Sequence, residues 1–153
     1  AEFMISTNPG MPVRPLGMVA SGGELSRIML AIKAVLADTD DIPTLIFDEI
    51  DTGISGHIAE VVAEKMASIA KYHQVLCVTH LAQIAAMADT QYRVQKNVID
   101  ERTYTTVTEL DKNGRIDEVA RLIGVSSDQQ ASGFAHARAL LNAGAKWKKE
   151  HLA

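Results

Sequence analysis

The sequence predicts an α/β fold in which a mostly parallel sheet is flanked by helices, and two observations support this fold class. First, from Ser21 to Ala88 helix-spaced apolar residues alternate with short apolar runs, in the order helix, strand, helix, strand, helix. Second, the runs Thr44 to Phe47 and Gln74 to Thr79 are rich in strand-favouring residues and too short for helices. We expect both strands to be buried, the first on both faces. Strands joined through helices should be parallel neighbours with right-handed crossovers.

The composition is that of an ordinary globular protein. Of 153 residues, 47% are hydrophobic and 22% are charged, so we expect a single domain over 1–153 with a real core. The net charge of −4 gives no general attraction to nucleic acid or to an anionic membrane. The lone cysteine, Cys77, can form no internal disulfide, which suits a reducing compartment. No apolar run is long enough to span a membrane, and we expect a soluble protein of the cytoplasm.

The elements follow one another from the amino terminus with clear boundaries. Prolines exclude a helix from the first stretch, so we expect an extended lead-in over 1–18. The periodicity predicts three helices in the central part, from Ser21 to near Asp38, from about Gly53 to about Tyr72, and from Leu81 to Ala88.

The last third of the chain has a different pattern. Tyr92 to Lys96 and Thr103 to Leu110 are β-prone with interleaved polar residues, which predicts a more exposed antiparallel hairpin. A turn is expected at Asp111 to Gly114. We expect C-terminal helices over Ile116 to Ile123 and Gln129 to Leu141, a break at 124–128, and a flexible tail over 142–153.

Two carboxylates stand at the end of the first predicted strand. Asp48 and Glu49 follow it directly, and His80 closes the second strand. The carboxyl ends of parallel strands share one edge, where open α/β sheets bind ligands, so these three residues form one candidate site. Because burying carboxylates is costly, the pair suggests a metal ion, a phosphate-bound magnesium or a general base. The alternative is a solvated acidic turn and an ordinary strand-end histidine.

The first helix opens with Ser21, Gly22, Gly23 and Glu24. Ser21 and Glu24 have the spacing of a capping box. The glycines cost about 1 kcal/mol each relative to alanine inside a helix, so they indicate that another group approaches the backbone closely. Exposed amides at a helix amino terminus favour phosphate, and a phosphate site could coexist with the capping box.

These motifs, in this order and spacing, resemble those of ABC-type ATPases of the SMC-like branch. The stretch Val19 to Arg27 resembles the signature motif, and Thr44 to Glu49 resembles the Walker B strand. The following Ile50 to Ser55 resembles the D-loop, and Val78 to His80 resembles the switch histidine. The resemblance thins after about Asp111, and it implies a partial ABC-type ATPase head.

The resemblance implies a cofactor, ATP with Mg²⁺, held between two head protomers. The signature residues Ser21, Gly22, Gly23 and Glu24 would meet the nucleotide bound by the other protomer, with Ser21 and the glycine amides on its γ-phosphate. The resemblance also implies a bacterial protein of DNA double-strand-break repair and recombination, associated with the nucleoid, which reaches DNA through the full protein.

The resemblance assigns one task to each residue of the strand ends. Asp48 would orient Mg²⁺ through its water shell, and Glu49 would polarise the attacking water. His80 would contact the γ-phosphate, and Asp51 would couple the two sites of the dimer. Asp51 could instead cap the helix that follows Gly53.

The sequence departs from the family pattern, because the P-loop, the glutamine loop and the coiled coil expected of the family are missing. A P-loop, G-x-x-x-x-G-K-[ST], is not present, so the chain should not hydrolyse ATP alone. We expect an ATPase only in combination with an amino-terminal, P-loop-bearing half of the same protein, of which this chain is a fragment. Two alternatives stay open: a magnesium-dependent nuclease or phosphotransferase using Asp48, Glu49 and Asp51, and a non-catalytic assembly module.

Overall fold

The computed structural model describes residues 2–6, 9–19, 21–39, 41–125 and 130–152. The chain divides into two compact units, Ala1–Thr79 and His80–Ala153, and each is described here by itself. The expectation of one domain over 1–153 stays a prediction. In the described part of the chain no helix combines the length and the apolar character needed to cross a bilayer.

The first unit begins with a small extended region. Strand β1 (Met4–Ile5) pairs antiparallel with β2 (Arg14–Pro15), as an extended lead-in predicts, and the four-residue helix α1 (Leu16–Val19) follows. The helix was not expected. Pro15 does not prevent it, because a proline is tolerated where it precedes the first turn.

Helix α2 (Gly22–Leu36) begins at the predicted residue. Ser21 is its N-cap, and both bonds of the predicted capping box are present. At the other end, the buried His73 ties the helix to the strand that follows. Its Nδ1 lies 2.6 Å from the Ile42 carbonyl oxygen, and its Nε2 lies 3.0 Å from that of Ala37.

Strands β3 (Thr44–Phe47) and β4 (Gln74–Cys77) form the predicted parallel pair, and helix α3 (Gly56–Ile69) lies between them in the chain. The prediction that β4 is buried is wrong, because none of its residues is buried and Leu76 is 45% exposed. The prediction that β3 is buried on both faces is also wrong. Leu45 and Phe47 are buried, but Ile46 is 71% exposed. Strand residues alternate between faces, and in the described part of this unit only one face of β3 is covered.

The core of the first unit lies between helices and the covered face of the strands, and α2 contacts α3. Its buried apolar side chains include Leu30, Leu45, Phe47, Ile50, Val62, Ala63, Met66 and Ile69. The covered face therefore anchors the strand that leads to Asp48.

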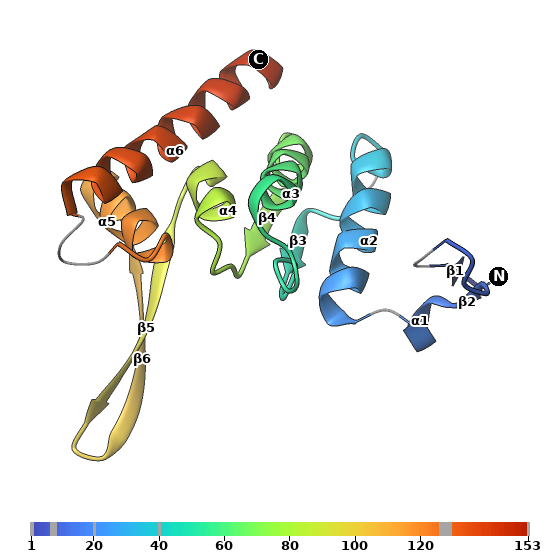
Figure 1. The fold of residues 1–153 in the computed structure, drawn as a ribbon, viewed down its shortest axis with the longest axis horizontal. Coiled ribbons are helices and arrows are strands. Elements are labelled where there is room, and N and C mark those ends of the chain that lie inside the picture. Colours follow the sequence, from blue (N-terminus) through green and yellow to red (C-terminus); the bar gives the residue numbers. More distant parts are fainter. Residues whose placement is uncertain (1, 7–8, 20, 40, 126–129, 153) are drawn as a thin grey trace. The chain divides into compact units, whose positions relative to one another are not determined.

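The second unit is built from helices α4 (Ala82–Met87), α5 (Lys112–Leu122) and α6 (Gln130–His151) (Figure 1). Five of their buried residues form one apolar cluster: Ala82, Ala86, Val119, Ala120 and Ala137. Gly144 allows α6 to approach α4, because a Cβ there would lie 3.1 Å from the Ala86 carbonyl oxygen.

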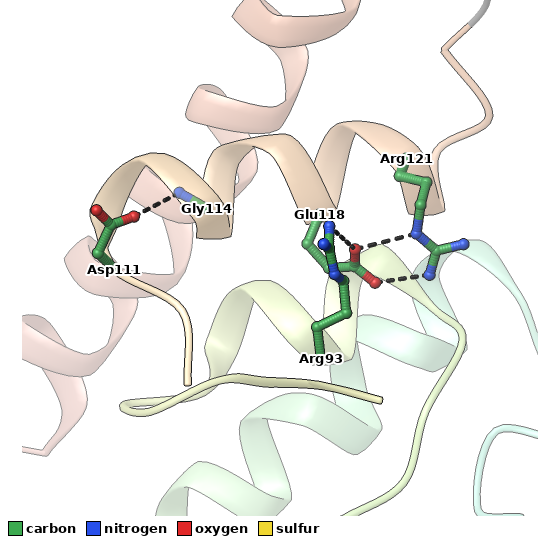
Figure 2. Close-up of polar contacts among 5 residues, drawn as sticks. All are labelled: Arg93, Asp111, Gly114, Glu118 and Arg121. Atoms are coloured by element: carbon green, nitrogen blue, oxygen red, sulfur yellow. Dashed lines mark hydrogen bonds and ion pairs between the residues drawn. The ribbon is translucent and has the colours of Figure 1, made fainter. Parts of the chain in front are cut away.

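Two expectations for this region differ from the structure. The residues expected as a turn at Asp111 to Gly114 begin α5 instead, with Asp111 as N-cap accepting a 2.7 Å hydrogen bond from the Gly114 amide (Figure 2). The expected tail over 142–153 is helical as far as His151. It stays helical because Gly144 meets α4 and Lys148 pairs with Asp89 at 2.5 Å. Of the expected break at 124–128, residues 126–128 lie outside the described residues.

The predicted hairpin consists of β5 (Tyr92–Ile99) and β6 (Arg102–Glu109), antiparallel in register from Tyr92↔Glu109 to Ile99↔Arg102. Figure 1 shows it as a two-stranded ribbon extending from the helices of its unit. Asp100 and Glu101 form its turn with φ of 49° and 61°. Every residue of β6 is exposed, as the interleaved polar pattern predicts.

A buried carboxylate stabilises α5 (Figure 2). Glu118 accepts hydrogen bonds from Arg121 Nε at 3.0 Å and from Nη2 at 2.6 Å, and Arg93 Nη1 lies 3.9 Å away. This bidentate pair raises the pKa of the Arg121 guanidinium. Arg115 has another task, since its Nη2 donates to the Ala88 carbonyl oxygen at 2.6 Å at the end of α4.

Candidate functional site

The acidic pair lies at the exposed end of β3. Asp48 Oδ1 accepts a 2.9 Å hydrogen bond from the Glu49 amide, and both residues are exposed. Glu49 has a φ of 57°, in the left-handed region. That conformation costs a residue with a side chain about 1–2 kcal/mol, so surrounding contacts must hold it.

The amino terminus of α2 lies against this acidic segment. A Cβ added at Gly22 would lie 2.5 Å from Glu49 Oε2. A Cβ at the buried Gly23 would lie 2.8 Å from the Glu49 carbonyl oxygen and 3.0 Å from Thr52 Cβ. The glycines do permit a close approach, as the sequence predicted, but the approaching group here is the Glu49 to Thr52 segment. Contact with a phosphate stays a prediction.

Two polar side chains of α2 hold the same segment, and sequence reasoning gave them no role. Ser26 Oγ donates to the Asp48 carbonyl oxygen at 2.9 Å. Arg27 Nη1 donates to the carbonyl oxygens of Ile50 at 3.0 Å and Thr52 at 2.9 Å. Their spacing could have indicated this role. Ser26 and Arg27 lie three and four positions after Gly23 and therefore share a helix face with it.

Asp51 lies in the same segment but points into the protein. It is 3% exposed, and its Oδ2 accepts a 2.6 Å hydrogen bond from Thr79 Oγ1. Asp51 therefore joins the segment after β3 to the segment after β4. The N-cap of α3 is Ser55, so Asp51 does not cap that helix.

The charges of the site affect two titratable groups. Burial raises the pKa of the Cys77 thiol to about 12, and the carboxylates of Asp51 and Asp48 add to the effect. The hydrogen bonds that Ser21 donates to Glu24 from its backbone amide, at 2.8 Å, and from its hydroxyl, at 3.1 Å, lower the pKa of that carboxyl.

The residues fit a magnesium ion that also has phosphate ligands. Mg²⁺ in nucleotide sites takes one or two protein carboxylates together with phosphate oxygens and water, and the exposed Asp48 carboxylate suits that role. No group of three or more metal-binding side chains occurs within the described ranges. A metal site formed by Asp48, Glu49 and Asp51 is disfavoured, because the Asp51 carboxylate is buried and accepts a hydrogen bond from Thr79.

Among the predicted site residues, the structure brings seven together within the first unit: Ser21, Gly22, Gly23, Glu24, Asp48, Glu49 and Asp51. His80 is exposed and is the first residue of the second unit. The expectation that His80 shares an edge with Asp48 and Glu49 stays a prediction.

The fold resembles that of an SMC ATPase head. A solved structure described as "Structural biochemistry of ATP-driven dimerization and DNA stimulated activation of SMC ATPases" matches with a TM-score of 0.52 at 20% identity, covering 81% of each chain. A comparison with models of protein families finds no match.

The chain belongs to the family of the DNA repair protein RecN. It is 48% identical to RecN of Treponema pallidum over 148 residues and 50% identical to RecN of Bacillus subtilis over 122 residues.

These alignments cover most of this chain but a small part of each relative. They include 97% of this chain for the Treponema pallidum protein and 80% for the Bacillus subtilis protein. The chain spans 26% and 21% of the length of those two relatives. It therefore corresponds to about a quarter of a RecN protein.

Proposed function

We propose that this chain is the carboxy-terminal lobe of an ATP-hydrolysing SMC-like head that acts in the repair and recombination of DNA double-strand breaks. The observation that carries the proposal is the attachment of the α2 amino terminus to the Asp48 to Thr52 segment. The signature-like and Walker B-like motifs, separated in sequence, thus form one structural group.

In the proposed site each residue acts on the nucleotide or on the attacking water. Asp48 orients Mg²⁺, which neutralises phosphate charge, and Glu49 polarises the water. His80 contacts the γ-phosphate.

The remaining proposed site residues act across a head dimer. Ser21, Gly22, Gly23 and Glu24 meet the nucleotide held by the second protomer, where the amides at the start of α2 suit a phosphate. Asp51, anchored on Thr79, fixes the segment that links the two nucleotide sites.

The missing P-loop defines the first proposed partner, and the family resemblance suggests the other two. The amino-terminal half of the same protein supplies the phosphate cradle, a second head completes each site, and DNA binds the full protein. The chain alone is therefore inactive, because it has no lysine-bearing loop to hold the β-phosphate.

The proposal is tested by substituting Glu49→Gln in the full-length protein that carries this chain. Glutamine keeps the shape of the side chain but cannot act as a base, so ATP affinity should persist while turnover falls at least about a hundredfold. Equilibrium ATP binding and phosphate release are the two measurements. Glu60→Gln, which removes an exposed carboxylate on α3, is the matched control and should behave as wild type.

Two results would contradict the proposal. The first is unchanged phosphate release by the Glu49→Gln protein. The second is magnesium-dependent DNA cleavage by the chain that disappears in Asp48→Asn, which would favour the nuclease.

A further inference from the structure

Arg27 lies in the middle of the contact between α2 and the acidic segment. We infer that Arg27 is a positioning residue that holds Glu49 in its working conformation and so links the signature turn of one nucleotide site to the base of the other. The inference rests on the proposed function, because it assigns Arg27 a task in that same reaction.

The geometry of the contact is that of a clamp. One nitrogen of Arg27, Nη1, donates to the Ile50 carbonyl oxygen at 3.0 Å and to the Thr52 carbonyl oxygen at 2.9 Å. Ser26 Oγ holds the Asp48 carbonyl oxygen at 2.9 Å. Alternate carbonyl groups along five residues therefore accept hydrogen bonds from a single turn of α2.

Glu49 is the residue that this clamp controls. It lies between the held carbonyl groups of Asp48 and Ile50 and has a left-handed φ of 57°. Without the clamp the backbone can relax toward a commoner conformation, which turns the carboxylate away from its present direction. Displacement of a reacting group by about 1 Å can reduce a rate about a hundredfold.

The clamp also connects two places that act on different nucleotides in the proposed dimer. Gly22 and Gly23, one turn before Arg27, are proposed to meet the nucleotide of the second protomer. Glu49 is proposed to act on the nucleotide of its own head. Because the Gly23 backbone lies so close to Glu49 that an added Cβ would be 2.8 Å from the Glu49 carbonyl oxygen, a shift of α2 in one site is transmitted to the base in the other.

The test uses the full-length protein with Arg27→Met and Arg27→Lys. Methionine removes the donors but keeps an unbranched apolar stem, and lysine keeps the charge with its terminal nitrogen one bond short. We expect kcat for ATP to fall about ten- to a hundredfold in Arg27→Met, with the ATP dissociation constant changed less than about twofold. Arg27→Lys should restore part of the lost kcat.

Arg115→Met is the matched control. Arg115 also donates two hydrogen bonds to carbonyl groups, those of Ala88 and Asp89, but it does so in the second unit. Its substitution should lower the thermal midpoint without lowering kcat in the folded protein. If Arg27→Met does not fold, the intermediate kcat expected for Arg27→Lys, at unchanged ATP affinity, decides the question.

The outcomes separate this inference from the proposed function. Three results would overturn the role of Arg27. They are a wild-type kcat in a folded Arg27 variant, an equal loss of kcat in Arg115→Met, and a loss of ATP affinity in proportion to the loss of kcat. The proposed function fails on different results: no ATP turnover by the wild-type protein, unchanged turnover in Glu49→Gln, or the magnesium-dependent DNA cleavage described above.

Discussion

Substitution of Gly23 by alanine tests the contact on which the site is built. The new Cβ would lie 2.8 Å from the Glu49 carbonyl oxygen, 3.0 Å from Thr52 Cβ and 3.1 Å from Arg27 Nη1. Two of these three neighbours belong to the clamped segment, and one is backbone. The methyl group therefore cannot be accommodated by a single side-chain rotation.

The magnitude follows from two opposing terms. Overpacking at a filled site costs about 1–3 kcal/mol. Alanine regains up to about 1 kcal/mol of helix propensity. We therefore expect Gly23→Ala to lower the free energy of unfolding by about 1 kcal/mol.

Gly22→Ala is the matched control, one residue earlier in the same turn. Its Cβ would come closest to Glu49 Oε2, at the end of a flexible, exposed side chain that can rotate away. We expect its free energy of unfolding to stay within about 0.5 kcal/mol of wild type. Urea unfolding of the 153-residue chain, followed by circular dichroism, measures both variants. A Gly23→Ala chain as stable as the Gly22→Ala chain would show that the added methyl group does not clash with the Glu49 to Thr52 segment.

Three further predictions concern single groups. The pKa of Cys77 is raised from 9.0 to about 12. Alkylation of Cys77 by iodoacetamide near pH 8 should therefore be on the order of a thousandfold slower in the folded chain than in the urea-unfolded chain. Equal rates would contradict the burial of the thiol. Folding lowers the pKa of Glu24 from 4.5, so the ionised carboxylate stabilises the folded chain. This stabilisation is fully present above pH 4.5 and is lost as the pH falls through the pKa of the folded state. The difference in urea midpoint between wild type and Glu24→Gln should therefore shrink on acidification, and a constant difference down to about pH 3 would exclude this effect. Glu118→Gln should lower the free energy of unfolding by about 1–2 kcal/mol. The loss is smaller than for a fully buried ion pair, because Arg121 is largely exposed. A urea midpoint equal to that of wild type would show that the ion pair does not stabilise the fold.

The sequence predicted what local patterns control. The parallel pairing of β3 with β4 was predictable because two short apolar runs are separated by a helix. The capping box was predictable because both of its hydrogen bonds lie within one turn, between Ser21 and Glu24. The position of Asp48 and Glu49 at a strand end followed from the same short-range pattern.

Features that depend on tertiary contact were not predictable. Gly23 and Arg27 meet a segment more than 20 residues away in sequence, and the local pattern could indicate a close approach but not the approaching group. Asp111 to Gly114 has the composition of a turn, and the same residues suit a capped first helical turn, since an aspartate side chain bonds a nearby amide in either case. The exposure of Ile46 depends on what covers the sheet, and the type of residue in a strand does not indicate this.

We propose above that this chain carries half of an ATPase site. The most direct measurement is phosphate release from Mg-ATP by the chain alone, by the P-loop-bearing amino-terminal half alone, and by a mixture of the two. We predict turnover in the mixture alone, and its loss when the chain carries Glu49→Gln. Turnover by this chain without its partner, or no turnover by two folded halves that associate and bind ATP, would contradict it.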